Sequence, residues 1–276
     1  LLLEPFDLTR SNAEARDAAE LHLVAEAEKL AYADRDRYLA DPDAVAIPAG
    51  MLDPAYLSER RRLIDSGRAM PRPAAGQPPG ALPAGSDATR ERAGTTHLSV
   101  IDGDGNAVAL TATIESAFGS HIWAAGFLLN NELTDFSFLP ADADGRTAAN
   151  AVGPGKRPRS SMAPTIVLDG KDNVESVVGS VGGNHIIMYV VEALVALIDW
   201  RLDAQQAAAL PHSGSMGDML DLEWSFAMPW RALRMKAFGH RIRPRLMTSG
   251  THILTRRGDM IQGGADPRRE GVALGD

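Results

Sequence analysis

The sequence contains no cysteine, which excludes disulfide bonds, thiolate catalysis and cysteine-ligated zinc but leaves the compartment open. Basic residues are outnumbered, with 28 Lys and Arg against 36 Asp and Glu and a formal charge of −8. Because phosphate binding needs a concentrated basic surface, this balance argues against a nucleic-acid partner. The seven histidines lie far apart without a His-x-x-x-His pair, so we expect no metal site and no cofactor. We expect His97, His185 and His212 to lie in the core or to support the residues of a site without contacting its ligand.

Long hydrophobic runs are missing as well. The longest apolar stretch, residues 186–198, is interrupted by Glu192 and is too short to span a membrane. The chain opens on LLLEP at residues 1–5, without an initiator methionine or a signal-peptide pattern, and we expect it to continue something longer. What is present, 276 residues with an apolar fraction of 45%, is enough for one large domain or two small ones.

Three segments of different texture divide the chain. In residues 1–67 the pattern predicts a helix over Asn12–Tyr32, behind a capping-box spacing at Ser11–Glu14, and a second helix over Pro54–Asp65. Residues 68–94 are rich in proline, alanine and glycine, and we expect an exposed, flexible linker, because so little apolar surface cannot offset the entropy of ordering. In residues 95–276 strands alternate with helices, which fits two sheets covered by helices.

A strand pattern begins at Thr95. Residues 95–102 and 107–114 alternate in a strand-like way around an Asp-Gly-Asp-Gly-Asn turn, which predicts a β-hairpin and sets Thr113 beside Thr95 to within one residue. If the bond between Gly94 and Thr95 is cut, Thr95 carries both a hydroxyl nucleophile and a free amine that can act as its base. The reference pKa of an α-amine is ~7.7–8.0, so much of it is available near neutral pH. On residue type alone, a threonine at a strand start is more often only a good strand former.

Further elements are expected from the same patterns. Buried strands are expected at 126–131 and 165–169, other strands at 174–180, 220–226, 242–247 and 252–256, and helices at 186–200 and 230–238.

Six motifs in order resemble the small subunit of γ-glutamyltranspeptidases. They are TTHxSV at 95–100, DGNAV at 104–108, FGS at 118–120, LNNExxDF at 129–136, RPxSSMxPT at 157–165 and GG at 182–183. Residues 1–67 more weakly resemble the C-terminal end of that family's large subunit. The resemblance implies an α+β fold, the αββα sandwich of N-terminal nucleophile (Ntn) hydrolases, made as a proenzyme that cleaves itself before the threonine. It also implies that the N-terminal part of the large subunit is lacking here.

The resemblance assigns catalytic roles to four residues. Thr95 is implied to be the nucleophile, and Thr113 to be the second threonine that orients its hydroxyl. Gly182 and Gly183 precede a helix, so their backbone N–H groups can form an oxyanion hole at the positive end of its dipole. The structural alternative is a tight turn between a strand and a helix.

The resemblance also assigns substrate contacts. Glu132 and Asp135 are implied to hold an α-ammonium group, and Ser160 and Ser161 to donate to an α-carboxylate, which together complement a zwitterionic γ-glutamyl head. Without the resemblance, these residues would be unremarkable surface features. Glu115 stands where many members carry an asparagine, and its negative charge lies close to a site meant to bind a carboxylate.

The expected function is that of a γ-glutamyltransferase or glutathione hydrolase, in which Thr95 takes a γ-glutamyl group as an ester and passes it to water or to an acceptor. The expected partners are a small γ-glutamyl substrate, an amino-acid or peptide acceptor and, if it is encoded separately, the rest of the large subunit. Glu115 and the short stretch 138–149, which lacks a lid tyrosine, favour instead an acylase similar to cephalosporin acylases. A third hypothesis is an inactive fragment or scaffold, because the family's carboxylate-clamping arginine lies outside this chain.

Overall fold

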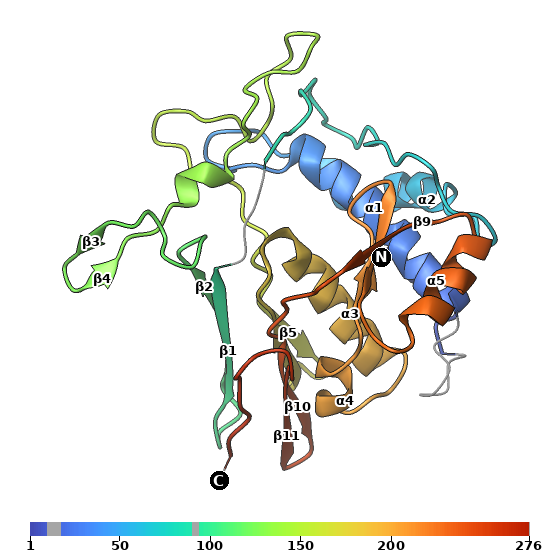
Figure 1. Cartoon of the computed structure of the whole chain (residues 1–276), viewed down its shortest axis with the longest axis vertical. Helices are drawn as coiled ribbons and strands as arrows, with labels where there is room; N and C mark the ends of the chain where they lie inside the picture. The colour runs from blue at the N-terminus through green and yellow to red at the C-terminus, as the bar shows by residue number, and fades with distance from the viewer. Residues whose placement is uncertain (10–17, 90–93, 276) are drawn as a thin grey trace.

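Two β-sheets packed face to face form the centre of the structure, a computed structural model that describes residues 1–9, 18–89 and 94–275 (Figure 1). The smaller sheet is the hairpin of β1 (Thr95–Ile101) and β2 (Ala107–Thr113). The larger sheet is antiparallel in the order β11-β10-β6-β5. Its strands are β5 (Thr165–Leu168), β6 (Val174–Gly179), β10 (His252–Arg257) and β11 (Met260–Ala265). In the stack, β1 contacts β6 and β10, and β2 contacts β5 and β6.

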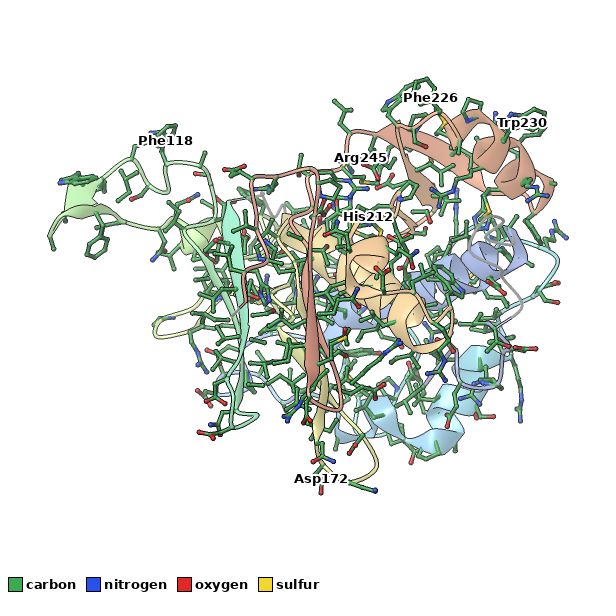
Figure 2. The ribbon with its side chains drawn as sticks, turned by 90° about the horizontal axis from the view of Figure 1, so that it is seen from below. Phe118, Asp172, His212, Phe226, Trp230 and Arg245 are labelled. Carbon is green, nitrogen blue, oxygen red and sulfur yellow. The ribbon has the colours of Figure 1, made fainter. Side chains whose placement is uncertain are left out.

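Helices cover the other face of the larger sheet. Helix α3 (Ile186–Ile198) contacts β6, and α4 (Ala204–Ala208) contacts β10 and β11. One apolar core joins these helices and strands to α1 (Ala18–Tyr38). Viewed from below, the hairpin, the larger sheet and the helices follow one another as layers (Figure 2). This is the layer order of an αββα sandwich in which the described residues form no helical layer over the outer face of the hairpin. That face exposes Leu98, Val100, Val108 and Leu110.

The C-terminal half adds a smaller three-stranded sheet beside α1. Its strands are β7 (Ser213–Gly214), β8 (Met219–Glu223) and β9 (Arg241–Arg245). Strands β8 and β9 are parallel, and α5 (Met228–Ala237) makes the crossover that parallel strands require. The remaining elements are short: η1 (Ala49–Leu52), α2 (Pro54–Arg61), β3 (Trp123–Ala124), β4 (Phe127–Leu128), η2 (Glu132–Asp135) and η3 (Gly183–His185). None of the described helices has both the length and the apolar character that a membrane span needs.

Most of the predicted elements are present, with different bounds. The helix expected to end at Tyr32 continues to Tyr38, because the first two charged residues beyond it, Asp34 and Arg35, are buried and paired. Asp34, for example, accepts a hydrogen bond from Tyr56 at 2.7 Å and pairs with Arg60 at 3.1 Å. The predicted capping box at residues 11–14 lies outside the described residues. The buried strand expected at 126–131 is wrong: only the two residues of β4 are strand, and Phe127 is exposed.

The linker prediction needs a correction for residues 68–89. The segment has no helix or strand, as expected, but hydrogen bonds and an ion pair hold it against the rest of the protein. Gly76 N–H donates to Asp34 at 2.7 Å, Gly85 N–H donates to the carbonyl of Thr147 at 2.8 Å, and Asp87 pairs with Arg159 at 2.8 Å. The prediction considered only apolar burial, whereas these backbone groups and one buried carboxylate are satisfied by distant polar partners.

Candidate active site

The hairpin places the two predicted catalytic threonines opposite each other, because the ladder pairs Thr95 with Thr113. The Thr95 hydroxyl donates to Thr113 Oγ1 at 3.3 Å, and the Thr113 hydroxyl donates to the Gly94 carbonyl at 3.3 Å. The N–H of Glu115 donates to Thr113 Oγ1 at 2.9 Å and fixes that hydroxyl. One hydroxyl therefore contacts both the oxygen that would attack and the carbonyl that would be attacked. The register expected from the turn is confirmed.

Gly94 occupies a position where a side chain does not fit. A Cβ built there would lie 2.7 Å from the carbonyl carbons of both Glu115 and Ser116, and still closer to the Glu115 oxygen. Backbone atoms cannot move aside as a flexible side chain can. The peptide bond between Gly94 and Thr95 is therefore held against the chain that follows β2.

The backbone carbonyl of Glu115 lies against Gly94. A φ of 73° places Glu115, a non-glycine residue, in the left-handed region, and its side chain is buried with 2% exposure. One carboxylate oxygen accepts from the Asn131 side-chain amide, and the other has no hydrogen-bond partner among the described residues. A buried acceptor of this kind can receive a donor group from a ligand.

A buried asparagine joins the predicted carboxylate turn to the predicted serine pair. Asn150 is fully buried, its amide donates to the carbonyl of Asp135 at 2.7 Å, and its oxygen accepts from the N–H of Arg159 at 2.9 Å. Asp135 ends η2, which begins at Glu132 directly after Asn131. Contacts thus run from Thr113 through Glu115 to both predicted substrate-binding segments. Nothing in the sequence distinguishes Asn150 from other loop asparagines.

The two serines differ in their surroundings. Ser160 is exposed, and its oxygen accepts from the N–H of Met162 at 3.1 Å. Ser161 is buried, and its oxygen accepts from the Arg35 guanidinium at 2.5 Å. Arg35 belongs to α1, and no sequence pattern indicates that this arginine reaches a serine 126 residues later. The substrate contacts of these serines, Glu132 and Asp135 stay predictions.

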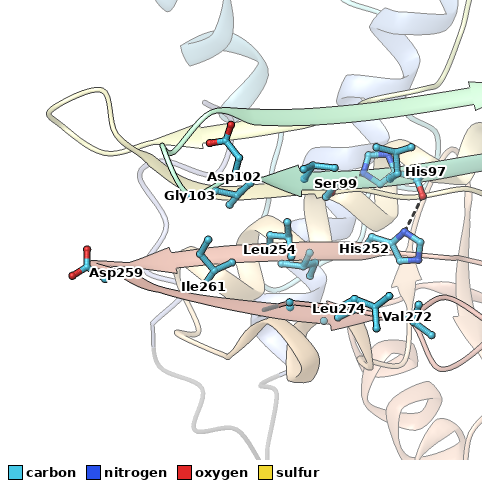
Figure 3. Close-up of a pocket in the computed structure, with 18 residues that line it drawn as sticks. His97, Ser99, Asp102, Gly103, His252, Leu254, Asp259, Ile261, Val272 and Leu274 are labelled. Atoms are coloured by element: carbon cyan, nitrogen blue, oxygen red, sulfur yellow. Dashed lines mark hydrogen bonds between the residues drawn. The ribbon is translucent and has the colours of Figure 1, made fainter.

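The Gly182-Gly183 turn lies at the same end of the stacked sheets as Thr95. His252 Nδ1 lies 2.9 Å from the carbonyl oxygen of His97, and β1 and β10 run in the same direction there (Figure 3). Because β6 is antiparallel to β10, its C-terminal end, which leads to Gly182, lies where β1 begins. Gly182 and Gly183 have φ of 138° and 62°, and their N–H groups have no acceptor among the described residues. Two unused donors at the start of a helical segment are suited to an oxyanion.

A buried polar chain supports this turn from behind. The ring of Tyr189 fills the space in front of Gly182 and packs on the His212 ring, with centroids 4.3 Å apart. His212 Nδ1 lies 2.5 Å from a Glu192 oxygen, and its Nε2 lies 2.7 Å from the Ser249 oxygen. Burial alone would lower the pKa of His212, but the Glu192 carboxylate raises it above its usual value. The contacts with Glu192 and Ser249 therefore fix the His212 ring against which Tyr189 packs.

The large cleft between β1 and β10–β11, with a volume of about 1000 Å³, is not the site of these groups (Figure 3). It is lined from His97 onward towards the hairpin turn and does not include Thr95. His97 is buried beside it, and burial together with the neighbouring His252 lowers the pKa of His97 to about 4. His97 is therefore a neutral core residue, as expected.

One group of described side chains has the composition of a metal site. Ligand atoms of His22, Glu26 and His240 all lie within 4.8 Å of one another. However, the Glu26 carboxylate already holds the Lys29 ammonium at 2.6 Å, and His22 Nε2 bonds to the carbonyl of Asp65 at 2.7 Å. A lysine ammonium in the cluster opposes a second cation, so we assign no metal to it.

Comparison with known proteins gives consistent matches. The model of the gamma-glutamyltranspeptidase family matches residues 1–276. The chain is 40% identical to the glutathione hydrolase proenzyme of Escherichia coli (strain K12) over 97% of its own length and 46% of that protein. It is 36% identical to the acylase ACY 1 proenzyme of Pseudomonas sp. (strain SE83), over 80% of this chain and 37% of that protein. The chain thus spans less than half the length of these curated relatives.

The fold matches solved structures of the same kind. The crystal structure of cephalosporin acylase from Bacillus halodurans aligns with a TM-score of 0.79 at 24% identity, over 98% of this chain and 48% of that chain. At that identity the likeness concerns the fold alone. It confirms the predicted α+β fold over nearly the whole chain.

Proposed function

The chain belongs to the gamma-glutamyltranspeptidase family, and on that premise we propose that it is the nucleophile-bearing part of a γ-glutamyltransferase or glutathione hydrolase. The observation that carries the proposal is the contact of one hydroxyl, that of Thr113, with both Thr95 Oγ1 and the Gly94 carbonyl. These contacts favour attack by Thr95. The Thr113 hydroxyl polarises the Gly94 carbonyl by donating a hydrogen bond to it, and it orients the Thr95 hydroxyl by accepting a hydrogen bond from it.

The first reaction is self-cleavage. The Thr95 oxygen bonds to the Gly94 carbonyl carbon, the C–N bond breaks, and the nitrogen takes up a proton as the α-amine of Thr95. Water then hydrolyses the ester, which returns the Thr95 hydroxyl and leaves a carboxylate on Gly94. The free amine can afterwards act as the base for the same hydroxyl.

Turnover uses the same oxygen on an external amide. Thr95 takes the acyl group as an ester, the amine of the substrate leaves with a proton, and water or an acceptor amine releases the acyl group. The N–H groups of Gly182 and Gly183 stabilise the oxyanion, and removing such a donor typically costs about 2.7–4 kcal/mol. Glu132 and Asp135 hold the α-ammonium of the γ-glutamyl group, and Ser160 and Ser161 bind its α-carboxylate.

The test is Thr95→Ala in the full-length protein. The variant should stay a single chain and hydrolyse no γ-glutamyl-p-nitroanilide, whereas the natural protein should split into two pieces, the second beginning Thr-Thr-His. Intact mass and N-terminal sequencing measure the first result, and release of p-nitroaniline measures the second. Thr96→Ala is the matched control, because Thr96 is the next residue but lies on the exposed face of β1. A natural protein that never splits would instead support the inert scaffold.

A second candidate is an acylase with a different acyl preference. The buried carboxylate of Glu115, with one oxygen lacking a partner among the described residues, favours it, because a like charge there opposes a substrate carboxylate. Rates with γ-glutamyl-p-nitroanilide and with butyryl-p-nitroanilide, whose acyl group has no carboxylate, separate the two. Turnover of the butyryl compound alone would establish the acylase.

A further inference from the structure

A cavity of about 410 Å³ opens directly beside Gly182. Its wall combines the turn and the start of α3 with β9 and the chain after it. The lining residues that matter here are Gly182, His185, Tyr189, Arg243, Arg245 and Thr248. The cavity therefore shares Gly182 with the oxyanion hole of the proposed reaction.

Two arginines line the cavity, and the carboxylate that they contact, Asp221, is not among its lining residues. Asp221 is buried with 1% exposure and accepts from Arg243 Nε at 2.5 Å and Nη2 at 2.9 Å. Burial would raise the pKa of Asp221, but hydrogen bonds from His185 and Arg243 hold it below its usual value, so the carboxylate is ionised. This single charge is satisfied by the paired donors of Arg243.

Arg245 makes a much weaker contact with the same carboxylate. Its Nη1 lies 3.4 Å from Asp221 Oδ2, which Arg243 already occupies, and its side chain is 39% exposed. A planar guanidinium with donors to spare is the side chain best matched to a carboxylate, which it binds through two parallel hydrogen bonds.

The position of the cavity decides which part of a substrate it receives. None of the residues predicted to bind the γ-glutamyl head (Glu132, Asp135, Ser160 and Ser161) lines the cavity, so the part of a substrate that reaches it from Gly182 is the amine. We propose that the cavity binds the carboxylate of that amine, so that Arg245 selects amino acids and peptides over amines without a carboxylate. This inference rests on the proposed function and names the amine partner of the same site.

The test compares two acceptors that differ only in this charge. In the full-length protein, transfer from γ-glutamyl-p-nitroanilide is measured to glycylglycine and to glycylglycinamide. Arg245→Gln should lower the ratio of kcat/KM for the two acceptors about tenfold or more, as expected for a hydrogen bond to a charged group. Arg241→Gln is the matched control: Arg241 lies on the same strand but outside the cavity and pairs with Asp218 at 2.6 Å. An unchanged ratio in Arg245→Gln would overturn the proposal.

Failure of the proposed function is a separate result. A protein that turns over no γ-glutamyl amide contradicts that function, and the cavity is then tested by calorimetric titration of the unreacted protein with the same two peptides. Tighter binding of glycylglycine that is lost in Arg245→Gln would retain the carboxylate subsite. Equal binding of both peptides, or binding that Arg245→Gln does not change, would reject it.

Discussion

Adding one methyl group at Gly94 should block maturation without unfolding the protein. In Gly94→Ala the new Cβ would lie 2.7 Å from the carbonyl carbons of Glu115 and Ser116. Restoring an ordinary contact of 3.4 Å to these carbons requires a movement of at least about 0.7 Å between Gly94 and the chain after β2, and relieving the closer contact with the Glu115 oxygen requires more. Because Thr113 precedes that chain by only two residues, the movement separates its hydroxyl from the Gly94 carbonyl.

The expected effect on self-cleavage is large compared with the effect on stability. A misplacement of about 1 Å can cost roughly 100-fold in rate, because reacting atoms must approach to near van der Waals contact. Overpacking by one methyl group typically costs about 1–3 kcal/mol of folding free energy. The variant should therefore fold and remain a single chain.

Maturation is followed by intact mass at intervals after expression, and folding by the midpoint of urea denaturation. Gly103→Ala is the matched control, because Gly103 lies in the turn of the same hairpin and a Cβ there would meet no heavy atom within 4 Å. Gly94→Ala that splits as fast as the natural protein would show that the packing of Gly94 against Glu115 does not position the bond.

Two further predictions concern buried ionisable groups. Glu115→Asn should lower the KM for γ-glutamyl-p-nitroanilide about tenfold, because it removes a negative charge that repels the substrate carboxylate. Glu115→Gln, which is neutral but keeps the side-chain length, should lower the KM as well. An unchanged KM in both variants would contradict a role of the charge. Burial and the nearby Lys29 and His22 lower the pKa of His240 to about 3, so the unfolded chain binds its proton first as the pH falls. The free energy of unfolding should therefore decrease as the pH falls below about 6.5, and it should decrease less steeply in His240→Gln. Urea midpoints between pH 7 and pH 4 measure both effects. Parallel pH profiles of the two proteins would contradict the role of His240.

The hairpin of β1 and β2 could be predicted because the sequence signals that specify it are local. The Asp-Gly-Asp-Gly-Asn turn fixes the register, and the register alone places Thr113 opposite Thr95. The helices over 186–200 and 230–238 are predictable for the same reason, since each repeats one apolar face within a few turns. Elements of this kind need no knowledge of what they pack against.

The surroundings of the site could not be predicted because they depend on distant partners. The contact between Arg35 and Ser161 joins residues 126 positions apart, and Asn150 joins two loops through its single side chain. Periodicity and propensity contain no information about such pairs. The same limitation explains the linker, whose polar backbone groups find partners that composition does not reveal.

Several of these distant contacts join a residue before Gly94 to a group that follows it in the chain. Tyr32 donates to the carbonyl of Asn184 at 2.6 Å, directly after the Gly182-Gly183 turn, and Arg35 holds Ser161. Asp87 pairs with Arg159. Cutting the bond before Thr95 would free its amine while leaving every one of these contacts intact. Residues before Gly94 are therefore part of the framework of the candidate site, and separation of the two pieces would remove these contacts from the Gly182-Gly183 turn and the serine pair.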